Sequence, residues 1–206
     1  FIMEKVFMKY ALIGDSHTQI VFPKLQKMIE DSGDTVVLSK PKAGWGVQSH
    51  LNDGLESLLK SYSPETVVYS LGGNNKDLDK KSYKEKIDRA IKAAYDSGAK
   101  RIIWVGPTTS LRQDVEDRHL WTHIFLKHYL PIRGIKYINV RSLTKDGHNT
   151  DLVHYPNSKY QEWAEYVFKR LPKFTLVQGQ ARNYVFRIPL WAYPTAFFIY
   201  YVYKNK

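Results

Sequence analysis

The chain has 206 residues, of which 43% are hydrophobic and 25% are charged, the balance of an ordinary globular protein. It contains no cysteine, which excludes disulfides, thiolate metal sites and a cysteine nucleophile. The formal net charge is +11, and residues 169–206 hold seven basic side chains and no acidic one. The first residues lack the long apolar core of a signal peptide, so we expect a cytoplasmic or particle-associated protein.

Strand-like and helical segments alternate along the chain. Short runs rich in β-branched or aromatic residues predict strands at 9–14, 35–39, 66–71, 101–105 and 136–140. Between them, a helical period is carried by Leu51, Leu55, Leu58 and Leu59, and by Ile87, Ala90, Ile91, Ala94 and Tyr95 before Gly98. Two further helices are predicted, one at 115–129 that ends before Pro131 and one at 157–171.

This alternation predicts a parallel sheet that is covered by helices on both faces. In such sheets, functional residues gather beyond the carboxyl ends of the strands. Four loops are therefore of interest, and they follow Gly14, Ser39, Leu71 and Val140.

The first two of these loops carry a serine and two glycines. Ser16 follows the first strand in the run Gly-Asp-Ser-His, where a turn before a helix exposes its hydroxyl and provides N–H groups for an oxyanion. The same position also suits a helix N-cap. Gly44 and Gly46 in the second loop let the backbone approach a ligand closely, or simply form a tight turn.

The last two loops carry an amide and an acid–base pair. Asn74 follows the third strand, where its side-chain amide can donate to a developing oxyanion. Asp151 precedes His154 by three residues, so that its carboxylate can orient the imidazole and leave the other ring nitrogen free for a serine proton. Each motif alone is weak, but together they supply nucleophile, base, acid and oxyanion donors at one sheet edge.

The set Gly-Asp-Ser, loop glycine, Gly-x-Asn and Asp-x-x-His resembles the four sequence blocks of the SGNH/GDSL hydrolase superfamily, over residues 9–171. The resemblance implies a flavodoxin-like three-layer α/β/α sandwich with a five-stranded parallel sheet of order 2-1-3-4-5. It implies Ser16 as nucleophile, with Asp151 and His154 completing the triad. The implied oxyanion donors are the N–H groups of Ser16 and of Gly46, for which Gly44 is the alternative, and the side chain of Asn74.

The resemblance also implies hydrolysis or transfer of acyl groups through an acyl-serine, without a metal or organic cofactor. Asn75 stands where the third block usually has an acid, which should alter the turn without removing catalysis. The run Gly-Asp-Ser-His resembles the carbohydrate O-acetyl esterases of the superfamily, so a small acyl ester of a glycan is the expected substrate. Trp45 and His17 are expected to contact it.

Two other histidine patterns offer alternatives. His119 and His123 are one helical turn apart with Glu116 nearby, which could bind zinc but is more typical of packing. His148 is a second candidate base, although it lacks an acid three residues before it.

Residues 172–206 are predicted to form a basic aromatic extension to a hydrolase domain at 1–171. Nine of the twenty residues from Tyr184 to Tyr203 are aromatic, and Pro189 and Pro194 interrupt the run. We expect this extension to bind a protein partner or a second copy, with packing on the hydrolase or contact with a membrane surface as alternatives. No nucleic-acid partner is expected. The alternative function is a binding or assembly protein on an SGNH scaffold, for example in a virion.

Overall fold

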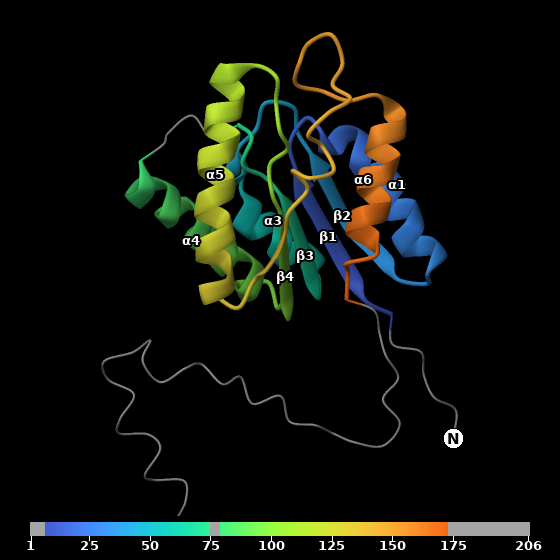
Figure 1. The fold of residues 1–206 in the computed structure, drawn as a ribbon. Helices are drawn as coiled ribbons and strands as arrows, with labels where there is room; N and C mark the ends of the chain where they lie inside the picture. Colours follow the sequence, from blue (N-terminus) through green and yellow to red (C-terminus); the bar gives the residue numbers. More distant parts are fainter. Residues whose placement is uncertain (1–6, 75–78, 173–206) are drawn as a thin grey trace, which may run out of the picture. The chain divides into compact units, whose positions relative to one another are not determined.

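The computed structural model describes residues 7–74 and 79–172 (Figure 1). The elements in chain order are β1 (Lys9–Gly14), α1 (Thr18–Asp31), β2 (Thr35–Pro41), α2 (Val47–Asn52), α3 (Leu55–Tyr62), β3 (Thr66–Ser70), α4 (Lys80–Asp96), β4 (Arg101–Val105), α5 (Gln113–Ile132), β5 (Lys136–Ile138) and α6 (Asn157–Phe168). All strand pairs are parallel and the order is β2-β1-β3-β4-β5. The predicted fold class and strand order are confirmed.

Alternate residues of the strands point to two separate cores, one on each face of the sheet. Ala11 and Ile13 of β1 face the core beneath α2, α3, α4 and α5, whereas Tyr10 and Leu12 face the core beneath α1 and α6. Figure 1 shows α1 and α6 on one side of the sheet, with α3, α4 and α5 on the other. Burial of the strands on both faces explains their continuous apolar composition.

The leucine stripe of residues 51–59 forms two helices instead of one. Gly54, between α2 and α3, has a φ of +74°, a conformation that a side chain rarely adopts. Leu51, Leu55 and Leu59 are nevertheless all buried in the same core. Here the local turn overrides the helical period.

The end of α5 also differs from its prediction. The helix continues through Pro131 to Ile132, because a proline in the last turn costs only one intrahelical hydrogen bond. The chain then reverses at Gly134, which has a φ of +70°, and the N–H of Ile135 donates to the carbonyl of Leu130.

Smaller differences concern exposure and strand length. Tyr95 was expected on the buried side of α4, but 46% of it is exposed. The last strand ends at Ile138, two residues before its predicted end, and α6 ends three residues before its predicted end. The remaining strands begin where predicted and end within two residues of the predicted positions.

The predicted aromatic extension lies outside the described residues apart from Pro172, whose carbonyl accepts a hydrogen bond from the Tyr10 hydroxyl at 3.2 Å. Its expected protein or membrane contacts, and the alternative assembly function that depends on them, therefore stay predictions. Asn75 also falls outside the described residues. Within the described ranges, every helix is too short or too polar to cross a bilayer.

Candidate active site

A tight turn between β1 and α1 presents Ser16. Gly14 ends the strand, and a Cβ at this position would lie 2.3 Å from the Thr18 hydroxyl oxygen, so only glycine fits. The Thr18 hydroxyl donates to the carbonyl of Asp15 at 2.6 Å, and the His17 N–H donates to the Asp15 carboxylate at 3.1 Å. The turn is therefore held by its own residues, and Ser16 remains partly accessible.

Three predicted side chains meet beyond the sheet edge. The Nε2 of His154 lies 3.2 Å from the Oγ of Ser16, and its Nδ1 lies 2.6 Å from Oδ2 of Asp151. A carboxylate can only accept a hydrogen bond, so Nδ1 carries the proton and Nε2 presents a lone pair to the serine hydroxyl. This is the arrangement that general-base activation of a serine requires.

The loop that carries Asp151 holds its carboxylate in the charged form. Oδ1 accepts hydrogen bonds from the N–H groups of Val153, at 3.0 Å, and of His154, at 2.8 Å. These backbone bonds, followed by the contact with the imidazole, lower the pKa of Asp151 to about 2. Leu152 adopts a φ of +62°, which turns the chain back so that both N–H groups face the carboxylate.

His17 lies against His154, with ring centroids 4.8 Å apart. Its Nδ1 is 3.0 Å from the Tyr160 hydroxyl, and burial lowers the pKa of His17 to about 3. It is therefore neutral at pH 7. It lines the cavity around Ser16, and its expected contact with a substrate stays a prediction.

The second and third loops meet at Gly46 and Asn74. The Asn74 Nδ2 donates to the carbonyl of Trp45 at 3.3 Å, and a Cβ on Gly46 would lie 3.0 Å from the Asn74 carbonyl oxygen. Gly46 is buried at the start of α2, whereas Gly44 is exposed, has a φ of +73° and lines the cavity with Asn74. Gly44 therefore adjoins the cavity, whereas Gly46 is not among its lining residues.

Trp45, expected to contact substrate, is not among the residues that line this cavity. Its ring packs edge-on against His50, with centroids 5.1 Å apart. The ammonium groups of Lys40 and Lys42 lie 5.8 and 5.7 Å from the ring centroid. These neighbours account for the position of Trp45 without a ligand.

The cavity has a volume of about 410 Å³. All four predicted loops contribute to it, and so does α5, through Val115, Arg118 and His119. The α5 residues were missed as site residues. Their spacing of three and four residues marks one helix face, but the sequence does not say that this face adjoins Ser16.

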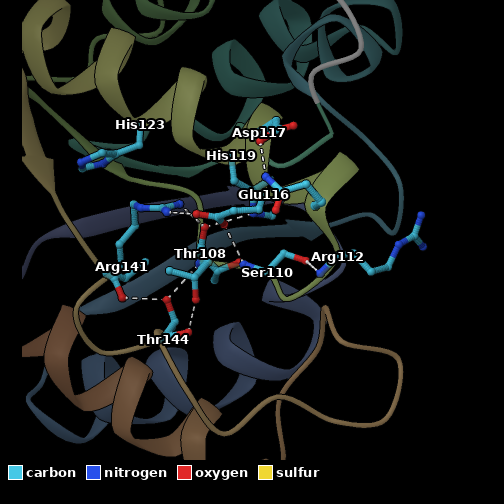
Figure 2. Close-up of polar contacts among 12 residues, drawn as sticks. Thr108, Ser110, Arg112, Glu116, Asp117, His119, His123, Arg141 and Thr144 are labelled. Carbon is cyan, nitrogen blue, oxygen red and sulfur yellow. Dashed lines mark hydrogen bonds and ion pairs between the residues drawn. The ribbon is translucent and has the colours of Figure 1, made fainter.

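His119 and His123 have separate structural partners. The Nδ1 of His119 donates to the Thr108 carbonyl at 3.0 Å, and the Nδ1 of His123 lies 2.7 Å from the Tyr137 hydroxyl. Glu116 is bound by Arg141 and by the Ser110 N–H (Figure 2). Among residues 7–74 and 79–172, no group of three His, Asp or Glu side chains is placed to hold a metal ion.

The other candidate base, His148, contacts a different set of groups. Its Nε2 lies 2.8 Å from the Tyr155 hydroxyl and 3.3 Å from the Thr109 carbonyl. His148 does not line the cavity. His154 does line it, and His154 is the histidine that contacts the carboxylate of Asp151.

Asp15 is a buried acid that the motif analysis did not consider separately. It lines the cavity, and burial raises its pKa to about 7. A Cβ on Gly73 would lie 3.5 Å from its Oδ2 and 2.9 Å from the Nε2 of His119. Glycine at position 73 therefore leaves these two polar groups room at the cavity floor.

Solved structures with the same architecture are hydrolases by their descriptions. A lipase/acylhydrolase from Enterococcus faecalis superposes with a TM-score of 0.68 at 16% identity, covering 82% of this chain and 100% of that one. A putative lipolytic protein of the G-D-S-L family from Desulfitobacterium hafniense superposes with a TM-score of 0.67 at 16% identity. The match covers 80% of this chain and 99% of that one. The chain has the SGNH/GDSL hydrolase fold.

A third structure with this SGNH/GDSL fold is a family 3 carbohydrate esterase from Talaromyces cellulolyticus. It gives a TM-score of 0.64 at 13% identity and covers 80% of this chain and 96% of that one. No protein-family profile and no curated protein sequence matches the chain. At these identities the similarity establishes the fold, and the activity must be argued from the site.

Proposed function

We propose that the protein is a serine esterase that removes small acyl groups through an acyl-serine intermediate. The observation that carries the proposal is the continuous chain from Ser16 Oγ to His154 Nε2, at 3.2 Å, and from His154 Nδ1 to Asp151, at 2.6 Å. A serine, an imidazole and a charged carboxylate in this order form the catalytic triad of acyl transfer.

Each side chain has a defined role in the reaction. Ser16 Oγ attacks the ester carbonyl while His154 Nε2 takes its proton, and the imidazolium is stabilised by Asp151. His154 then returns the proton to the departing alcohol, which leaves the acyl group on Ser16. A water molecule, activated by the same imidazole, releases the acid and restores the serine.

The oxyanion of the tetrahedral intermediate needs hydrogen-bond donors on the same side of the cavity. The N–H of Ser16 lies at the start of α1, where the helix dipole also favours negative charge. Asn74 and Gly44 line the cavity as the second and third donors, with Gly46 as the alternative glycine. One such donor lowers the barrier by about 3–4 kcal/mol.

An O-acylated sugar, with acetyl as the acyl group, is the substrate class that we propose. A cavity of about 410 Å³ is large enough for an acyl group and part of a sugar ring. The carbohydrate esterase from Talaromyces cellulolyticus, which shares the fold, supports this class. Transfer to another alcohol in place of water would use the same acyl-serine.

Replacement of Ser16 tests the proposal. Ser16→Ala should abolish turnover of p-nitrophenyl acetate and labelling by a fluorophosphonate probe, while the circular dichroism spectrum stays unchanged. Ser61→Ala is the matched control, because Ser61 is exposed on α3 and its hydroxyl donates to the Leu58 carbonyl of the same helix at 2.8 Å. Turnover that survives in Ser16→Ala, or a wild-type protein that neither reacts nor labels, would refute the esterase.

A further inference from the structure

One face of α5 brings a positive charge to the cavity that contains Ser16. Val115, Arg118 and His119 are spaced by three and four residues, so their side chains leave the helix on the same side. All three line the cavity together with Ser16 and His154. Arg118 is half-buried there.

The carboxylates near Arg118 along the helix are bound to other groups. Asp114 accepts two hydrogen bonds from Arg112, at 2.9 and 3.2 Å, and Asp117 accepts one from Gln113 at 2.6 Å. Glu116 is occupied by Arg141 and the Ser110 N–H (Figure 2). In the part of the chain that the structure describes, Arg118 therefore has no ion-pair partner, and its buried Nε has no hydrogen-bond acceptor.

The acids of the cavity wall do not neutralise Arg118 either. Asp151 is bound by two N–H groups and by the His154 imidazole. Asp15 accepts the His17 N–H, and burial raises its pKa to about 7, which diminishes its negative charge. A guanidinium with an unused buried donor thus lines a cavity whose two lining carboxylates, Asp15 and Asp151, form no ion pair with it.

We propose that Arg118 binds an anionic group, a carboxylate, of the ester substrate. The inference rests on the esterase function proposed above and narrows its substrate class to acidic esters such as acylated uronic acids. Arginine suits this role because its planar N–H groups match the two oxygens of a carboxylate. The net charge of +11 also favours the approach of anions.

The test compares charged and neutral esters in two pairs. O-Acetylated galacturonic acid against O-acetylated galactose places the charge on the alcohol, and p-nitrophenyl hemisuccinate against p-nitrophenyl acetate places it on the acyl group. In at least one pair, wild-type kcat/KM should favour the charged ester, and Arg118→Gln should reduce that preference at least about tenfold, mainly through KM. Arg118→Lys should restore part of it.

Lys127→Gln is the matched control, because it removes one positive charge from the same helix at an exposed position that does not line the cavity. This variant should keep the wild-type preference within about twofold. The proposal is overturned if wild type shows no preference in either pair, or if Lys127→Gln and Arg118→Gln change the preference equally.

A readout independent of turnover separates this proposal from the esterase proposal. Calorimetric titration of the acid from the preferred pair, galacturonate or succinate, into the Ser16→Ala protein should show binding that Arg118→Gln weakens at least about tenfold and that added salt weakens as well. Binding that is the same in both proteins overturns the role of Arg118. Absence of turnover and fluorophosphonate labelling refutes the esterase instead.

Discussion

At the scale of single residues, the site depends on a carboxylate that is held by the backbone. Two N–H bonds fix Asp151 before it contacts His154, so the imidazole meets an acceptor that is already charged and oriented. The same geometry selects the tautomer with its proton on Nδ1. Only this tautomer leaves Nε2 available to the Ser16 hydroxyl.

Asp151→Asn should therefore reduce kcat by about 10²- to 10⁴-fold, because an amide that donates to Nδ1 stabilises the wrong tautomer. Steady-state turnover of p-nitrophenyl acetate measures the effect. Asp146→Asn, an exposed change in the same connecting segment, should leave kcat within twofold. An Asp151→Asn protein with wild-type kcat would show that the imidazole is oriented by other groups.

Asn74 offers a second test at this scale. Its amide has two N–H donors, and one of them bonds to the Trp45 carbonyl at 3.3 Å, which leaves the other for an oxyanion. Asn74→Ala should lower kcat by about 10²-fold or more with a smaller change in KM, since the interaction strengthens in the transition state. A change confined to KM would assign Asn74 to substrate binding.

At the scale of elements, the packing of α1 against α6 positions the loops that hold Ser16 and His154. Ser16 precedes α1 and His154 precedes α6, and these helices share the core on one face of the sheet. Trp163 of α6 is 2% exposed and its ring centroid lies 5.7 Å from that of His17. Packing between the two helices therefore sets the distance between Ser16 and His154.

Trp163→Ala should lower the free energy of unfolding by about 3–5 kcal/mol, because it leaves a cavity beneath His17. Urea denaturation measures the loss, and kcat should fall in the same variant as the serine–imidazole distance relaxes. Glu162→Ala, at an exposed ion pair with Lys159, should change stability by less than about 1 kcal/mol. A loss of similar size in both variants would contradict the role assigned to this packing.

At the scale of the whole molecule, buried neutral histidines make the fold sensitive to acid. Burial lowers the pKa of His17 to about 3 and those of His50 and His119 to about 4. The unfolded chain binds these protons near pH 6.5, so stability is lost as the pH falls from about 6.5 towards 4. Asp15 has the opposite effect, because burial raises its pKa to about 7 in the folded protein. Its contribution to the stability of the fold is lost as the pH rises from about 4 to 7.

His50→Gln isolates one of these contributions. His50 is fully buried and donates from Nε2 to the Gly14 carbonyl at 3.1 Å, a bond that the glutamine amide can reproduce without titrating. Between pH 7 and pH 4, the variant should lose about 3 kcal/mol less stability than wild type. Urea unfolding at the two pH values measures the difference, and equal losses in both proteins would contradict it.

The sequence by itself determined most of the elements and the four loops that hold the candidate site residues. Strand and helix periods are local properties, so strands such as 9–14 and 101–105 could be located exactly, as could the order of the sheet through the resemblance. The positions of Ser16, Asn74, Asp151 and His154 followed from the rule that parallel strands end at one edge. The sequence analysis missed the helix break at Gly54 and the continuation of α5 through Pro131. Both depend on the backbone angles of single residues, which a periodic pattern does not report.

Only the tertiary structure decided which side chains share the cavity. The period of α5 marks a face with Val115, Arg118 and His119, but it does not say whether that face meets the sheet, solvent or Ser16. The ring of Trp45 packs against Lys40, Lys42 and His50. Gly44 lines the cavity, whereas Gly46, the glycine that the resemblance placed first, does not. These outcomes depend on contacts between segments far apart in the chain, whereas a periodic pattern reports only on near neighbours.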